Sequence, residues 1–174
     1  VAFPLNTLGH AILKSKPEGE RLEQAAECFQ RAYDIRYRRL GENHPETLRS
    51  KYSLGMIHEE RGDYPEAERI QREVLQQRRG FLEEDHIDIL HSLNYVARAL
   101  ERQERFAEAA DIYRDIITRG RARFGVTQPS IQWFHENLLS LLRRQDDQEG
   151  IRAHYVDYLD QLDAASRGLE VDYR

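Results

Sequence analysis

Cysteine and long apolar runs are scarce in this chain of 174 residues, and each scarcity excludes a class of protein. Cys28 is the only cysteine, so neither an internal disulfide nor a cysteine-rich metal site is expected. No stretch reaches the ~18 consecutive apolar residues of a membrane span, and no signal-type segment opens the chain. We therefore expect a cytoplasmic protein without membrane contact. Because the sequence begins with Val1 rather than methionine, we also expect it to be part of a larger protein.

The sequence also lacks an excess of basic residues and recognisable catalytic motifs. Acidic residues outnumber basic ones, 31 to 26, which argues against a nucleic-acid binder, whose affinity rests on a basic face. Clusters such as Arg78-Arg79 end predicted helices, where the helix dipole favours cations. The sequence has neither a G-x-x-x-x-G-K loop nor a G-x-S-x-G turn, so we expect no enzyme activity and no cofactor. The spacing of His86, Asp88 and His91 does not converge on one metal, so no metal site is expected.

The sequence is, by contrast, rich in self-similarity at one spacing. Steps of 42 residues connect the apolar residues Ala25, Ala67, Ala109 and Ile151. The same step connects the loop segments that begin at residues 44, 86 and 128. A register that holds at helix and loop positions alike indicates a repeat protein, in which each unit packs only against its neighbours.

Apolar residues at helical spacing predict two helices in every copy. Gly41 and Gly125 are expected to stop helices, whereas Pro45 and Pro129 are expected near helix starts. The predicted helices span residues 4–16, 20–40, 46–61, 65–79, 87–103, 106–119, 129–144 and 148–166, with Gly168 as the last stop. We therefore predict an all-α fold in a single array, residues 1–174, with units at about 4–40, 45–82, 87–124 and 129–167.

Small residues recur in both helices of the central units. In the first helices, a small residue follows an apolar one in the pairs Leu54-Gly55 and Val96-Ala97. In the second helices, the small residues are Ala67 and Ala109, and the aromatic Tyr113 stands four residues after Ala109. This pattern resembles the tetratricopeptide repeat (TPR), and a unit longer than the usual ~34 residues resembles its 42-residue, kinesin-light-chain type. The resemblance implies a right-handed α-solenoid of four helix-turn-helix units. It also implies a non-enzymatic scaffold whose first helices line a concave groove that binds an extended protein or peptide segment.

In that family an asparagine just before the apolar-small pair grips the peptide backbone. Asn94 matches this position, while the second unit has Tyr52 there and the fourth has Glu136, with Asn137 beside it. Helical spacing adds residues on the same face. The predicted peptide-binding groove comprises Arg49, Tyr52, Met56, His91, Asn94, Arg98, Arg102, Trp133, Asn137, Arg143 and Arg144.

Basic residues outnumber acidic ones on the groove face of the third and fourth units. The residues are Arg98, Arg102, Arg143 and Arg144 against Glu101 and Glu136. This local excess predicts an acidic ligand, since arginine pairs bind carboxylates in a forked geometry. Two alternatives stay open: the arginines pair with the neighbouring glutamates on a solvated face, and Trp133 packs against the 125–128 connection instead of anchoring a ligand.

A function of another class is compatible with the same repeat. A solenoid with uncapped ends can stack on itself. The array would then be a structural, self-assembly or sensor module of a multidomain signalling protein, such as a nucleotide-binding immune-type receptor. A size that grows with concentration in the absence of peptide would favour this alternative.

Overall fold

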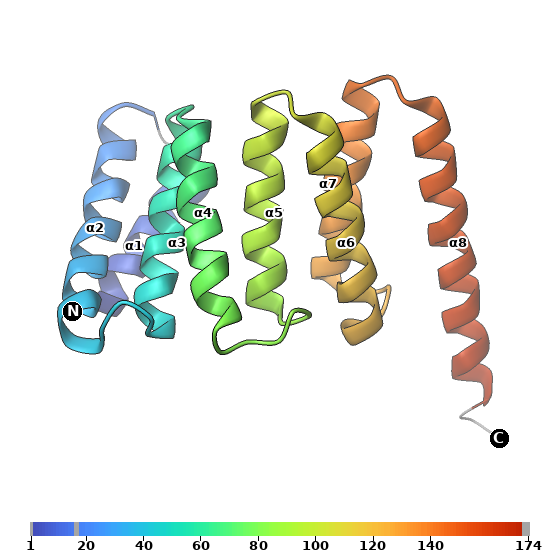
Figure 1. Cartoon of the computed structure of the whole chain (residues 1–174), viewed down its shortest axis with the longest axis horizontal. Helices are drawn as coiled ribbons and strands as arrows, with labels where there is room; N and C mark the ends of the chain where they lie inside the picture. The colour runs from blue at the N-terminus through green and yellow to red at the C-terminus, as the bar shows by residue number, and fades with distance from the viewer. Residues whose placement is uncertain (1, 16–17, 172–174) are drawn as a thin grey trace.

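The computed structural model describes residues 2–15 and 18–171, and within them the chain forms a row of eight helices and no strand (Figure 1). The helices are α1 (Ala2–Lys14), α2 (Glu20–Leu40), α3 (Pro45–Glu60), α4 (Tyr64–Arg79), α5 (Ile87–Arg102), α6 (Phe106–Phe124), α7 (Pro129–Arg144) and α8 (Gln148–Val171). Each helix packs against the next one along the chain, as expected for a repeat array.

Two helices extend beyond their predicted ends. α6 continues to Phe124, although the prediction ended at residue 119, and α8 continues through Gly168 to Val171, so the predicted stop at Gly168 is wrong. Glycine inside a helix costs only about 1 kcal/mol. It ends a helix where the chain needs a positive φ, as at Gly41 (87°) and Gly125 (83°). The predicted end of the first helix, at residue 16, lies outside the described residues.

Small residues let the two helices of a unit approach closely. Ala67 and Ala109 have exposed fractions of 2% and 0%. A Cβ added to Gly55 would lie 2.4 Å from Nε2 of Gln71, so only glycine fits there without movement of that amide. Gln71, which stands where another unit has Tyr113, uses its amide to donate a hydrogen bond of 2.9 Å to the Tyr52 carbonyl oxygen. The amide nitrogen of this polar exception is therefore paired, whereas Oε1 of Gln71 is buried without a hydrogen-bond partner among the described residues.

Enlarging Ala109 tests this close approach. Ala109→Leu is expected to lower the free energy of unfolding by roughly 1 to 3 kcal/mol, because extra methylenes in a packed core force side chains off their rotamers. Ala107→Leu, two residues away on the exposed side of α6, should change it by less than about 0.5 kcal/mol. Urea denaturation of both variants measures the difference. Equal stabilities would mean that the α5–α6 contact tolerates a larger side chain.

Buried arginines bridge the first two junctions between units. Arg36 of α2 donates a hydrogen bond of 2.7 Å to Ser50 Oγ of α3, and Arg78 of α4 donates one of 2.7 Å to Ser92 Oγ of α5. Each of these arginines is 5% exposed. Arg78 belongs to the Arg78-Arg79 cluster that the sequence analysis assigned to helix-dipole stabilisation. In the fold, Arg36 and Arg78 connect one unit to the next.

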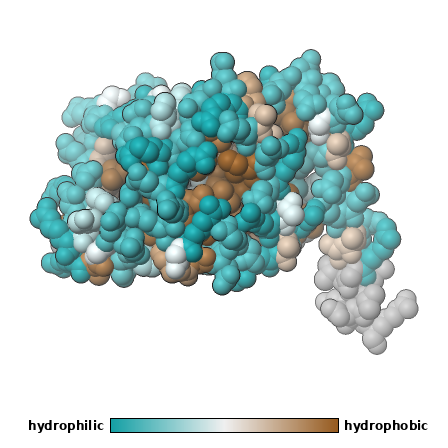
Figure 2. Space-filling model, in the orientation of Figure 1, coloured by the Kyte–Doolittle hydropathy of each residue, from teal (hydrophilic) through white to brown (hydrophobic). Residues whose placement is uncertain are grey.

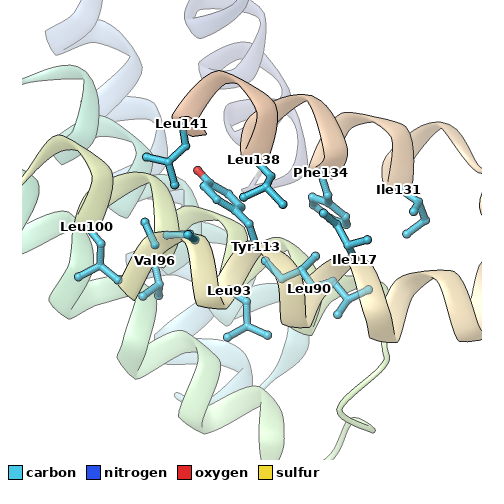
Figure 3. Packing of buried hydrophobic residues seen from close by; sticks show 14 of the residues in the cluster. Leu90, Leu93, Val96, Leu100, Tyr113, Ile117, Ile131, Phe134, Leu138 and Leu141 are labelled. Carbon is cyan, nitrogen blue, oxygen red and sulfur yellow. The ribbon is translucent and has the colours of Figure 1, made fainter. Parts of the chain in front are cut away.

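The third junction is apolar at the same positions. Gly120 and Phe134 stand 42 residues beyond Arg78 and Ser92, and the Phe134 ring is fully buried. Figure 3 shows Ile117 of α6 pointing toward this ring, with Tyr113 one turn earlier on the same side. This junction lies in the main core cluster, which is formed by α5, α6 and α7 with Leu75 of α4.

Candidate functional site

A polar cavity of about 300 Å³ lies between α5 and α7. We call it the α5–α7 cavity. It is lined by Arg98, Glu101, Arg102, Tyr113, Trp133, Asn137 and Ser140. Four of these residues, Arg98, Arg102, Trp133 and Asn137, belong to the predicted groove. Trp133 and Ser140 are seven residues apart, which is about two turns of a helix. Two turns of α7 therefore lie opposite the last turns of α5.

Asn94 lies behind this cavity and has no exposed surface. Its side-chain oxygen accepts a hydrogen bond of 2.8 Å from Nδ2 of Asn137, while its own Nδ2 is buried without a partner among the described residues. Asn94, the asparagine that the resemblance assigned to peptide binding, is therefore covered, and Asn137 lines the cavity instead. Asn94 holds the Asn137 amide from below. The sequence placed the two residues on one face but could not show which of them covers the other.

The arginines of the groove face are largely paired with acids. Arg98 contacts Glu59 of α3 at 2.6 Å, and its guanidinium lies 5.0 Å from the centroid of the Tyr95 ring. Burial raises the pKa of the Glu59 carboxyl, with Arg98 partly opposing that shift. Burial alone would lower the pKa of Arg98, but the adjacent Glu59 carboxylate makes the net shift upward. Arg144 forms an ion pair with Glu101.

Arg102 differs from these paired arginines. It is exposed, lines the α5–α7 cavity, and has no ion pair or hydrogen bond with any side chain in the described part of the chain. Glu101 beside it is already occupied, because it also accepts a hydrogen bond of 3.3 Å from the Tyr113 hydroxyl. The uncompensated positive charge of the cavity is therefore concentrated at Arg102. The sequence left open whether the groove arginines are free or paired with glutamates, and in the structure Arg98 and Arg144 are paired.

The aromatic residues of the predicted groove form two contacts between units. Tyr52 of α3 meets Tyr95 of α5 edge to face, with ring centroids 5.0 Å apart, and burial raises the Tyr52 pKa well above its usual value. His91 lies 5.9 Å from the Trp133 ring, and burial lowers its pKa. Trp133 is half-buried against the main core cluster and also borders the cavity.

Seven of the eleven predicted residues do not line the α5–α7 cavity, among them Arg49, Met56 and Arg143. Arg49 forms an ion pair of 3.0 Å with Glu46 at the start of α3, and Met56 is half-buried on the same helix. Arg143 donates a hydrogen bond of 3.1 Å to the Tyr155 hydroxyl. Arg143 lines the cavity between α7 and α8, whereas Arg98 and Arg102 line the α5–α7 cavity, so the four arginines do not line one cavity.

A second cavity, of about 550 Å³, lies between α7 and α8, and we call it the C-terminal cavity. It is lined by Gln132, His135, Glu136, Leu139, Arg143, His154, Tyr155 and Tyr158. Nδ1 of His135 lies 3.0 Å from Nε2 of His154. Burial lowers the pKa of His135 to about 4, and the neighbouring His154 adds to that shift.

Sequence reasoning missed the pair of histidines and the pairing of Glu59 with Arg98. Helical spacing does place Glu59 on the groove face, and the repeat register agrees, because Glu59 stands 42 residues before Glu101. No comparable signal marks His135 and His154, which come from different helices. In the described part of the chain, no group of three His, Cys, Asp or Glu side chains is arranged to hold a metal ion. Nor does any helix there have the length and apolar composition that a bilayer crossing requires.

The helices form pairs that repeat in one register, and the first helices of successive pairs lie side by side. This arrangement defines a helical-repeat solenoid. The model of the tetratricopeptide repeat family matches residues 18–76 and 50–122. The chain therefore belongs to the tetratricopeptide repeat family. Repeats of this family generally mediate protein–protein interactions and act as non-enzymatic scaffolds.

Solved structures share this fold along nearly the whole chain. One is a Podosopora anserina protein described as a kinesin light chain with nearly identical TPR-like repeats, with 19% identity, a TM-score of 0.73, and coverage of 97% of this chain and 77% of that one. Another is BtubC (BKLC) from P. vanneervenii, with 16% identity, a TM-score of 0.76, and coverage of 95% and 64%. The predicted all-α, kinesin-light-chain-like repeat solenoid is thus confirmed. A comparison with curated protein sequences gave no match.

Proposed function

We propose that this repeat scaffold binds an extended acidic peptide across the α5–α7 cavity. The observation that carries the proposal is Arg102, an exposed guanidinium at a polar cavity without an acidic partner among the described residues. A ligand carboxylate that contacts it gains a charge-assisted, forked hydrogen bond and displaces no existing ion pair. Asn137, at the wall of the same cavity, supplies an amide that can bond a peptide backbone.

The paired arginines have a different part in this proposal. Arg98 is paired with Glu59, and Arg144 is paired with Glu101. Because of these ion pairs, the two arginines contribute less to binding a ligand carboxylate than an unpaired arginine does. They fix the shape of the cavity wall and leave Arg102 as the point of recognition. Arg102 is the one cation in the cavity lining without an acidic partner among the described residues, which favours a peptide with one well-placed acidic side chain over a long acidic run.

Reversing the charge at Arg102 tests this function. Binding to a peptide array of random sequences, sorted by net charge, is expected to favour acidic peptides, and Arg102→Glu should weaken those interactions by about tenfold or more. Raising the salt concentration should weaken them too, since an exposed contact is screened. Arg31→Glu makes the same change in net charge at an exposed site on α2 and serves as the matched control.

The two variants separate a local contact from a general charge effect. An equal loss of peptide affinity in Arg31→Glu and Arg102→Glu would mean that binding depends on the overall charge of the array and that the cavity is not the binding site. An unchanged affinity in Arg102→Glu would exclude the proposed contact. Asn137→Ala provides a second measurement at the same cavity, and it should weaken peptides of any charge because the amide is expected to contact the backbone.

A further inference from the structure

The last residues of three first helices share one register position on the groove face. Glu60 ends α3, Arg102 ends α5 and Arg144 ends α7, and they stand 42 residues apart. Arg144 is paired with Glu101. Glu60, like Arg102, is exposed and has neither an ion pair nor a side-chain hydrogen bond within the part of the chain that the structure describes. Two neighbouring helices therefore end in unpaired charges of opposite sign.

Glu60 stands where a negative charge does not stabilise the fold. The C-terminal end of a helix carries a partial negative charge, which favours a cation there and disfavours a carboxylate. Burial raises the pKa of the adjacent Glu59 carboxyl; Arg98 opposes this shift, and the charge of Glu60 adds to it. His58 and Arg61, the nearest basic residues in sequence, each pair with another acid. A residue that breaks a local rule without a compensating contact is a candidate for binding.

The last turns of α3 and α5 lie next to each other. Arg98 of α5 reaches Glu59 of α3 at 2.6 Å, and this pair adds no net charge beside Glu60 and Arg102. Helices in contact have axes about 8–10 Å apart, and an extended peptide advances about 3.3 Å per residue. A peptide that crosses from α3 to α5 therefore covers that distance in about three residues.

Charge, more than apolar area, distinguishes this part of the surface. On α3, α5 and α7, which lie in the described part of the chain, no large apolar side chain is strongly exposed. The side of the array shown in Figure 2 is likewise mostly hydrophilic. On such a surface, the placement of charges decides which partners are accepted and in which register they bind.

We infer that the ligand carries a basic residue about three positions from its acidic residue, so that the basic side chain pairs with Glu60 while the acidic one pairs with Arg102. The inference rests on the proposed function, because it requires the contact between the ligand carboxylate and Arg102. The two contacts fix the register and the direction of the peptide, since the opposite placement would bring like charges together. Glu60 also repels a long acidic run, so the partner is a segment of mixed charge.

A scan of synthetic peptides tests the spacing. Each peptide consists of glycine, serine and alanine with one central glutamate, and one lysine moves a residue at a time to either side of it. Affinity for the full chain is measured by fluorescence anisotropy. With the lysine about three residues away on one side, binding should be about threefold tighter than with glutamine at that position, which is the size of an exposed ion pair. Equal affinity for every lysine position would overturn the inference.

Reversing the charge of Glu60 gives a second test. In Glu60→Lys, the preferred lysine peptide should lose affinity, and the peptide with glutamate in place of that lysine should gain it. Glu27→Lys makes the same change in net charge at an exposed site on α2 and should keep the original preference. Urea denaturation should show Glu60→Lys to be at least as stable as the unchanged chain, because a cation suits the end of a helix.

Arg102→Glu separates this inference from the proposed function. If acidic peptides depend on Arg102 but neither the lysine position nor Glu60→Lys changes their affinity, the inference is wrong and the proposed function stands. If the peptides do not depend on Arg102, both are wrong, because the glutamate contact places the lysine beside Glu60.

Discussion

Arg78→Ala is expected to lower the free energy of unfolding by about 3 kcal/mol. The buried guanidinium of Arg78 donates hydrogen bonds to Ser92 Oγ, at 2.7 Å, and to the Asp88 carbonyl oxygen, at 2.8 Å. Hydrogen bonds made by a charged group contribute roughly 1.5 to 3 kcal/mol, and truncation to alanine also leaves a cavity where the aliphatic stem packed. Chemical denaturation measures the change directly.

Two further variants show whether the bonds or the packing carry this effect. Arg79→Ala, one residue along, removes an exposed ion pair with Glu84 and should cost less than about 1 kcal/mol. Arg78→Met keeps the stem and lets Ser92 retain its hydrogen bond to the Asp88 carbonyl oxygen, so its cost should be about 1 kcal/mol. If Arg78→Met is as unstable as Arg78→Ala, the junction depends on the hydrogen bonds more than on the stem.

Acidification from about pH 7 to about pH 5 is expected to cost about 2 kcal/mol of stability through His135. Burial lowers the pKa of His135 from 6.5 to about 4, although Asp157 nearby opposes the shift. Below pH 6.5 the unfolded imidazole therefore binds a proton that the native one does not yet accept. Stability is complete above the unfolded pKa and falls as the pH drops toward the folded one. The lowered pKa values of His91 and His154 act in the same direction.

His135→Phe isolates this contribution. The phenylalanine ring does not titrate in this range, so the difference in unfolding free energy between the two pH values should shrink by about 2 kcal/mol. The absolute stability of the variant is not the readout, because the hydrogen bond to His154 is lost at both pH values. Parallel stability-versus-pH curves for the variant and the unchanged chain would show that His135 titrates normally. Glu68 and Glu84 have lowered pKa values, and their loss of stability begins at lower pH.

Most helix positions could be predicted because their signals are local. The starts of α3 and α7 follow from Pro45 and Pro129, and the end of α2 follows from Gly41, which adopts a positive φ. The end of α6 was placed five residues too early, at 119, although Gly125 with its positive φ marks the observed end. The error at Gly168 has the same local origin. A glycine by itself does not reveal whether the chain needs a positive φ there, and this is decided by what the next segment packs against.

The candidate site was predictable only in part. The register placed Asn137, Arg102 and Trp133 on one face, and they do border one cavity. It did not reveal that Asn94 is covered, or that Glu59 takes Arg98 as its partner. These pairings join side chains about 40 residues apart in sequence, and they depend on the angle and spacing between neighbouring helices.

The sequence by itself determined the period, the pairing of helices and the small residues at their contacts, because each of these repeats every 42 residues and acts within one unit. Only the tertiary structure decided which charges remain free and which surfaces remain uncovered. Arg98 and Arg102 are both arginines on one turn of α5, yet only the first reaches an acid on the preceding unit. Tyr113 and Tyr155 occupy one register position, yet only the first is buried. Burial and pairing arise from neighbouring units, and no single unit of the sequence contains that information.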